Sequence, residues 1–286
     1  MESRPFNTSS MGKHLTATQI DAFHRDGFVF PIDVLSPAEV RSIMTRLNAA
    51  EAVDPDAFAG ENRNNAHLAH DFFDEIVHHP RIADAVEDLI GPNILAMSTV
   101  VFAKDARSKG YVSWHQDGRY TALSDATPVT AWVALTDSTV RNGAMRMAPG
   151  THLGDYLEHD DTFAKDNILT RGQNIASIDE STAVPVTLKA GQMSLHHWKV
   201  AHASSPNTSN ARRIGFSIQA YIRPETRQTE GRGFAQLVRG EDPFGHMRLL
   251  PRVGELSERE AFALRDETNR LWLDQLYDGA ETRRAF

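Results

Sequence analysis

Residues 94–135 read ILAMSTVVFAKDARSKGYVSWHQDGRYTALSDATPVTAWVAL, and this stretch decides the fold. It holds three β-rich runs separated only by turn residues: ILAMSTVVFAK (94–104), YVSWHQD (111–117) and PVTAWVAL (128–135). Further runs follow downstream: AMRMAP (144–149), AVPVTL (183–188), QMSLHHW (192–198) and RIGFSIQAYI (213–222). Short strands without helices between them are typical of an antiparallel sandwich or jelly roll. The sequence therefore predicts a β-core over residues 94–222.

Helical signals flank this core on both sides. Three helices are predicted before it: one opened by a capping box of Thr16 and Gln19, one opened by Ser36 and Glu39, and one over residues 81–90 ended by Gly91. Another helix is predicted over residues 257–278, opened by Ser257 and Glu260 and ended by Gly279. The predicted class is therefore α+β, with a single domain over residues 1–286.

Three polar segments are predicted to lack regular secondary structure. Residues 1–14 have no apolar core and predict a flexible lead-in rather than a signal peptide. Residues 54–66 are rich in Asp, Asn, Gly and Ala, which is typical of a surface loop. Residues 153–182 form a long insertion between strands, and insertions of this length are often lids or binding loops.

Composition excludes several classes of function. The 286 residues include 38 acidic and 30 basic side chains, a formal net charge of −8 that argues against nucleic acid or an anionic membrane surface as partner. The chain has no cysteine, which excludes disulfides, zinc ribbons, iron–sulfur clusters and thiol nucleophiles. No apolar run reaches the roughly 18 residues of a membrane span. We therefore expect a cytoplasmic protein that acts on a small molecule, and no feature of the chain specifies an oligomeric state.

The sequence Trp114-His115-Gln116-Asp117 is the first that suggests chemistry. On a strand, His115 and Asp117 share one face while Gln116 points the other way. An imidazole and a carboxylate side by side supply two metal ligands. By itself the triplet is weak, because ordinary packing or ion pairing explains most such triplets.

A second group, His202 followed 11 residues later by Arg213, strengthens the metal interpretation. In the run 213–222, alternation puts Ile214, Phe216, Ile218 and Ala220 on one face and Arg213, Gly215, Ser217, Gln219 and Tyr221 on the other. An arginine on the inner face of a β-core is costly unless an anion meets it, and its planar fork suits a carboxylate. The alternative is a salt bridge to an internal acid. Two histidines, a carboxylate and such an arginine fit a non-haem iron centre that uses a dicarboxylate cosubstrate.

These motifs, taken in order, resemble the phytanoyl-CoA dioxygenase family of Fe(II)- and 2-oxoglutarate-dependent oxygenases. The matching segments are WHQD (114–117), TAWVAL (130–135), NGAMRMAPGTH (142–152), and HASSPN with the following RR (202–213). The resemblance covers roughly residues 94–222, and the helical N-terminal third also fits. It implies a double-stranded β-helix, a cupin-like jelly roll, covered by N- and C-terminal helices. It also implies Fe(II), 2-oxoglutarate and O₂ as cofactor, cosubstrate and oxidant.

The resemblance assigns a role to each matched residue. His115, Asp117 and His202 would be the catalytic metal ligands, and Arg213 would hold the distal carboxylate of 2-oxoglutarate. Further cosubstrate contacts would be Ser204 and Trp132, and Thr130 is added because it shares a strand face with Trp132. Three candidates remain for substrate contact: Arg119, Tyr120 and His197. His196 and His197 compete with His202 for the third ligand position, but they lack its spacing to a serine and an arginine.

The same resemblance favours hydroxylation of an unactivated C–H bond. Halogenating relatives have a small residue where the metal carboxylate would be, whereas this chain keeps Asp117. The substrate classes of the family are amino acids, phosphonates, acyl thioesters and secondary metabolites. Desaturation or cyclisation by the same chemistry stays open. A non-catalytic cupin-like metal- or ligand-binding protein, or a structural domain in which the histidines only pack, are the alternatives from other classes.

Overall fold

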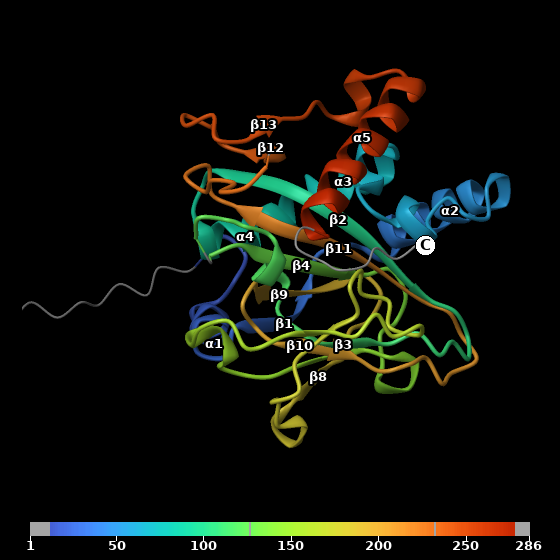
Figure 1. The fold of residues 1–286 in the computed structure, drawn as a ribbon. Helices are drawn as coiled ribbons and strands as arrows, with labels where there is room; N and C mark the ends of the chain where they lie inside the picture. Colours follow the sequence, from blue (N-terminus) through green and yellow to red (C-terminus); the bar gives the residue numbers. More distant parts are fainter. Residues whose placement is uncertain (1–11, 126, 232, 278–286) are drawn as a thin grey trace, which may run out of the picture.

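The computed structural model describes residues 12–125, 127–231 and 233–277, and it contains five α-helices (Figure 1). These are α1 (Ala17–Asp26), α2 (Pro37–Val53), α3 (Asp71–Val77), α4 (Pro80–Ile90) and α5 (Glu258–Leu276). The predicted capping boxes at Thr16, Ser36 and Ser257 are all present. The predicted end of α5 at Gly279 lies outside the described residues.

The strands reproduce the β-rich runs of the sequence. They are β1 (Phe28–Asp33), β2 (Ile94–Lys104), β3 (Val112–His115), β4 (Val129–Ala134), β5 (Met145–Met147), β6 (Asp160–Asp161), β7 (Gln173–Asn174), β8 (Val184–Val186), β9 (Gln192–His197), β10 (His202–Ser204), β11 (Arg213–Ile222), β12 (Phe234–Arg239) and β13 (Arg248–Leu249). Six of these strands were not among the predicted runs: β1, β6, β7, β10, β12 and β13. In β1, Pro31 interrupts the pattern. Because β1 lies at the sheet edge, the missing N–H of Pro31 is tolerated there.

Two sheets form the core, as predicted for a jelly roll. The larger has the order β1-β9-β4-β11-β2-β12-β13, and the smaller has the order β3-β10-β5-β8. Among the described residues, the strand pairings within these two sheets are antiparallel, except that of β12 with β13. Figure 1 shows the smaller sheet below the larger one, and α2, α3 and α4 pack against the other face of the larger sheet. The α+β jelly-roll prediction is confirmed.

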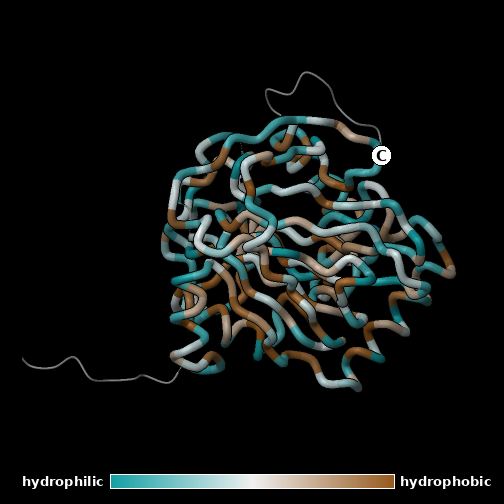
Figure 2. Tube along the Cα trace, turned by 90° about the horizontal axis from the view of Figure 1, so that it is seen from below, coloured by the Kyte–Doolittle hydropathy of each residue, from teal (hydrophilic) through white to brown (hydrophobic). Residues whose placement is uncertain are grey.

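The two faces of the seven-stranded sheet differ in character. On the helix face, Ile214, Phe216 and Ile218 of β11 belong to the main apolar core together with α2, α3 and α4. The ring of Phe216 stacks on that of Phe73 with 4.5 Å between centroids. Figure 2 shows brown segments in the interior and teal segments around the outside of the chain. The opposite face of the sheet lies toward the smaller sheet and lines a cavity.

The expected alternation along β11 fails near its end. Ala220 has a φ of +63°, in the left-handed region, and the pairing with β4 shifts register between Ile218 and Tyr221. As a result Tyr221 belongs to the helix-face core, where its hydroxyl donates to the carbonyl of Val77 at 2.7 Å. Ala220 packs instead with Trp198, which lines the cavity. The predicted faces of residues 220 and 221 were wrong, because a bulge of this kind reverses alternation.

Residues 54–66 are more buried than a surface loop. The side chains of Ala57, Phe58 and Ala66 are buried in the core, and the backbone N–H of Asn65 donates to Thr99 at 2.7 Å. The segment therefore folds back onto β2, and the surface-loop prediction was wrong for these residues. None of the helices among the described residues combines the length and apolarity needed to cross a bilayer.

Candidate metal and cosubstrate site

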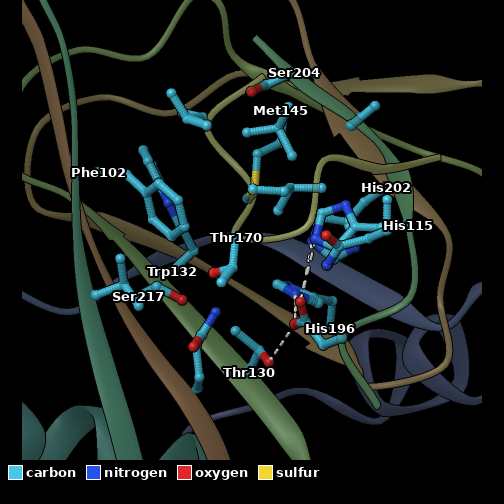
Figure 3. A pocket seen from close by; sticks show the side chains of 18 of the residues that line it. Phe102, His115, Thr130, Trp132, Met145, Thr170, His196, His202, Ser204 and Ser217 are labelled. Atoms are coloured by element: carbon cyan, nitrogen blue, oxygen red, sulfur yellow. Dashed lines mark hydrogen bonds and ion pairs between the residues drawn. The ribbon is translucent and has the colours of Figure 1, made fainter. Parts of the chain in front are cut away.

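A cavity of about 1030 Å³, counted with its open mouth, lies between the two sheets. Its wall contains the following predicted site residues: His115, Asp117, Thr130, Trp132, His202, Ser204 and Arg213. They come from β3, β4, β10, β11 and the turn after β3, so the jelly-roll pairing brings together segments that are far apart in the sequence. Figure 3 shows His115, His202 and His196 grouped on one side of the cavity, with Trp132 and Phe102 across from them.

His115, Asp117 and His202 form a group whose ligand atoms all lie within 4.8 Å of one another. Asp117 Oδ1 is 3.4 Å from His115 Nε2 and 3.6 Å from His202 Nε2. His115 and His202 are register partners on β3 and β10, which explains why their rings are adjacent. Asp117 reaches the group differently from the prediction, because β3 ends at His115 and Asp117 begins a 3₁₀ helix over Asp117–Tyr120.

Backbone carbonyls orient both imidazoles of this group. His115 Nδ1 lies 2.9 Å from the carbonyl of Ser113, and His202 Nδ1 lies 3.1 Å from that of Val200. A ring that donates from Nδ1 keeps an unprotonated Nε2, the usual arrangement of a metal-binding histidine. Burial, followed by the nearby His115, lowers the pKa of His202 to about 3. His202 is therefore neutral at physiological pH, as a metal ligand must be.

The second carboxylate oxygen of Asp117 is held from the other side. Thr130 Oγ1 donates to Asp117 Oδ2 at 3.0 Å, and His196 Nε2 lies 3.3 Å from the same oxygen (Figure 3). Burial alone would raise the pKa of Asp117, but His202, His115 and His196 outweigh it and hold that pKa well below its ordinary value. His196, a competing third ligand in the sequence analysis, thus contacts the carboxylate and is not part of the three-residue group.

Arg213 is a buried cation in another part of the cavity wall. Arg213 is 2% exposed, its Nη2 donates to the carbonyl of Gly143 at 3.1 Å, and its Nε has no hydrogen-bond partner. Its guanidinium carbon lies 5.2 Å from the ring centre of Trp132. Burial lowers the pKa of Arg213 to about 10, so the group stays charged. The expected alternative, a salt bridge to an internal acid, is not present among the described residues.

Two of the three predicted substrate contacts, Arg119 and His197, do not lie in the described wall of the cavity. The side chain of Arg119 is exposed to solvent, and that of Tyr120 is outside the described part of the structure. His197 is next to His196 on β9 but points away, and its ring lies 5.1 Å from that of His152. Adjacent strand residues face opposite sides, so only His196 turns into the cavity.

Several cavity residues were not found from the sequence. Among the residues that line the wall are Arg63, Asn64, Phe102, Ile168, Leu169, Thr170, Gln173, Ser217, Gln219, Trp272 and Leu276. Of these, Ser217 and Gln219 carried a signal, because they were predicted on the same face as Arg213. Residues 168–173 belong to the insertion, and Trp272 and Leu276 belong to α5, so both segments contribute to the wall.

Comparison with known proteins identifies the family. The sequence profile of phytanoyl-CoA dioxygenase (PhyH) matches residues 23–215, about two thirds of the chain. The chain belongs to the phytanoyl-CoA dioxygenase family. Fe(II), 2-oxoglutarate and O₂ are the cofactor set of this family, and the group of His115, Asp117 and His202 fits the metal.

Curated members of the phytanoyl-CoA dioxygenase family align with part of the chain. A probable alpha-ketoglutarate-dependent hypophosphite dioxygenase of Stutzerimonas stutzeri is 28% identical over 151 residues, which are 52% of either chain. An ectoine dioxygenase of Halomonas elongata is 27% identical over 154 residues, covering 48% of this chain and 46% of that protein. The chain therefore spans about half the length of these curated relatives.

A solved structure of the same fold matches more completely. The apo form of ThoJ, a non-heme monooxygenase, is 35% identical, with a TM-score of 0.79. The match covers 91% of this chain and 99% of ThoJ.

Proposed function

We propose that this protein is an Fe(II)- and 2-oxoglutarate-dependent dioxygenase that hydroxylates an unactivated C–H bond of a small molecule. The observation that carries the proposal is a single cavity containing both a two-histidine, one-carboxylate group and a buried arginine without a carboxylate partner among the described residues. Two histidines and one carboxylate leave three coordination positions for cosubstrate and oxygen. A guanidinium fork matches the distal carboxylate of 2-oxoglutarate.

Each residue has a defined part in this function. His115, Asp117 and His202 would hold the iron, with His196 and Thr130 fixing the second oxygen of Asp117 so that the first one faces the metal. Arg213 would bind the distal carboxylate beside Trp132, and Ser204 would donate to it. When bound, Fe(II) with 2-oxoglutarate and O₂ supplies oxidation of a nearby C–H bond, with succinate and CO₂ as coproducts. The protein orients these partners and keeps bulk water from them.

Asp117 supports hydroxylation over halogenation. Halogenating relatives lack a carboxylate at this position, and here the carboxylate is present and held by two neighbours. Reactions run with chloride and bromide should therefore give no halogenated product by mass spectrometry. A halide isotope pattern in the product would overturn the hydroxylase assignment.

The substrate is expected to be an amino acid, phosphonate, acyl thioester or secondary metabolite. The described wall carries apolar side chains such as Leu169, Trp272 and Leu276 next to the amides of Asn64 and Gln219. This mixture supports a small organic substrate with both apolar and hydrogen-bonding parts. Succinate formation stimulated by members of a small-molecule library would identify it.

The test of the proposed function is an anaerobic titration with Fe(II), with and without 2-oxoglutarate. A weak visible charge-transfer band should appear only when both are present. His202→Ala should lose the band, because it removes one metal ligand. Fe(II) binding without any response to 2-oxoglutarate would instead support a non-catalytic metal-binding protein of the same fold.

A further inference from the structure

Lys104 is a second buried basic side chain, directly opposite Arg213. The two residues are register partners on β2 and β11, and Lys104 is only 1% exposed. Like charges directly opposite on a sheet destabilise it, and a buried charge is costly unless it is paired. Among the described residues, no carboxylate forms an ion pair with either side chain. Two buried basic side chains without an acidic partner therefore fit an anion that is not part of the chain.

The hydrogen bonds of Lys104 lead to Ser204. Lys104 Nζ donates to Ser204 Oγ at 2.7 Å, to the carbonyl of Ser205 at 2.6 Å and, more weakly, to the carbonyl of Ser204 at 3.4 Å. An ammonium has three N–H donors and no acceptor, so these contacts use all of them. Ser204 Oγ accepts from Lys104, and its own proton therefore points elsewhere. Because Ser204 lines the cavity, that proton is available to a ligand there.

The side chains of Arg213 and Lys104 both lie next to Gly143. Arg213 Nη2 donates to the carbonyl of Gly143, and a Cβ on Gly143 would lie 3.2 Å from Lys104 Nζ. Burial first, and then the charge of Arg213, lower the pKa of Lys104 to about 6. Without an anion Lys104 is therefore mostly uncharged at pH 7, and a bound carboxylate would raise this pKa and restore the charge. Lys104 and an anionic ligand should therefore favour each other.

We infer that Lys104 is a positioning residue for the cosubstrate, which orients the Ser204 hydroxyl toward the distal carboxylate and adds a second positive charge opposite Arg213. The inference rests on the proposed function, since it takes 2-oxoglutarate as the ligand. It predicts that Lys104 contributes to selection of a 2-oxo acid with two carboxylates over one with a single carboxylate. Lys104 acts through Ser204 and through its field, without lining the cavity itself.

The test compares two ligands by calorimetry in the presence of Ni(II), a redox-inert substitute for iron. One ligand is 2-oxoglutarate and the other is 2-oxobutanoate, which lacks the distal carboxylate. Lys104→Met should weaken 2-oxoglutarate binding by about 10- to 100-fold, the effect of losing a charge-assisted contact, and change 2-oxobutanoate binding by less than about 3-fold. Lys109→Met, the same substitution at an exposed lysine, is the matched control and should change neither.

Ser204→Ala separates positioning from simple structural support. If Lys104 acts through the hydroxyl, its substitution should cost much less in the Ser204→Ala background than in wild type. The full loss in both backgrounds, or equal losses for both ligands, would overturn the inference. If Lys104→Met does not bind Ni(II), Ser204→Ala alone tests the inference. In that case an unchanged preference of Ser204→Ala for 2-oxoglutarate over 2-oxobutanoate would overturn it, because the hydroxyl would then not contact the distal carboxylate.

Failure of this inference is distinguishable from failure of the proposed function. If wild-type protein with Ni(II) binds neither oxo acid, the proposed function is wrong. If wild type binds 2-oxoglutarate and Lys104→Met binds it equally well, only the role of Lys104 is wrong.

Discussion

The two faces of the seven-stranded sheet share one backbone but differ in what they bury. Along β11, Ile214 and Phe216 on the helix face pack in an apolar core, while Arg213 and Ser217 on the other face line the cavity. Apolar burial lowers free energy wherever it occurs, whereas a buried charge without a partner raises it. The difference teaches that stability comes mainly from the helix face and ligand binding from the cavity face. Substitutions on the two faces should therefore have separable effects.

The largest expected effect is loss of the metal from the cavity. Asp117→Ala removes one of three ligands and leaves the helix-face core intact, so Ni(II) should no longer raise the melting temperature and succinate formation should be abolished. Thermal unfolding with and without Ni(II) measures this. Asp21→Ala, at an exposed aspartate of α1, is the control that should keep the Ni(II) effect. Metal-dependent stabilisation that persists in Asp117→Ala would refute the ligand assignment.

The corresponding change on the helix face is Phe216→Ala. Phe216 is fully buried and stacked on Phe73, so the substitution should lower the free energy of unfolding by about 3–5 kcal/mol. Denaturant unfolding measures this loss, and 2-oxoglutarate affinity of the folded protein should stay within about threefold of wild type. Phe244→Ala, at a phenylalanine that is 48% exposed, should change stability by only about 0.5 kcal/mol or less. A selective loss of ligand affinity in Phe216→Ala would contradict the separation of the two faces.

Arg213→Ala tests the cavity face of the same strand. Loss of a bidentate, charge-assisted contact is worth about 2–4 kcal/mol, so 2-oxoglutarate binding should weaken by roughly 30- to 1000-fold. Ni(II) binding should be nearly unchanged, because Arg213 is not in the metal-binding group. Arg213→Lys should recover only part of the affinity, since an ammonium lacks the fork. Calorimetry that shows unchanged affinity for 2-oxoglutarate in Arg213→Ala would exclude this arginine from the site.

The sequence predicted those features of the two sheet faces that depend on neighbouring residues along the chain. β-rich runs between turn residues located β2 and β11 with their observed ends. The order of motifs, through the family resemblance, placed His115, Asp117, His202 and Arg213 in one site, and all four line one cavity. Alternation could not predict Ala220, because its left-handed backbone reverses the faces and alanine carries no turn signal.

Tertiary contacts account for the other residues that the sequence did not indicate. The composition of residues 54–66 is typical of an exposed loop, and contacts with distant parts of the chain hold that segment beside the cavity. Among them, the backbone N–H of Asn65 donates to the carbonyl of Thr99 and Arg63 donates to the carbonyl of Ile168. Trp272 and Leu276 were predicted on a covering helix, and their place in the wall depends on how α5 packs. Lys104 was read as the end of a strand, since its burial depends on Ser204 and Ser205 from a distant part of the chain.

The smallest expected effect concerns a titratable group on the helix face. His67 is 1% exposed, its Nδ1 lies 2.9 Å from Thr99 Oγ1, and burial lowers its pKa to about 3 from an ordinary value of 6.5. Because the unfolded chain takes up this proton first, folding stability should fall as the pH decreases from 6.5 toward 3, with a limiting slope of about 1.4 kcal/mol per pH unit. Between pH 7.5 and 5 the contribution of His67 is therefore about 2 kcal/mol.

Denaturant unfolding of wild type and His67→Gln at these two pH values measures that contribution as a difference. The variant should lose less stability than wild type between pH 7.5 and 5, whatever its stability at pH 7.5, because glutamine takes up no proton. His24→Gln, at an exposed histidine of α1, should keep the wild-type pH dependence. At pH 7.5, where His67 is neutral, its replacement should leave 2-oxoglutarate affinity unchanged, since the side chain does not line the cavity. Equal pH dependence of wild type and His67→Gln would mean that His67 titrates alike in the folded and unfolded chain, and so that the helix face does not hold it neutral.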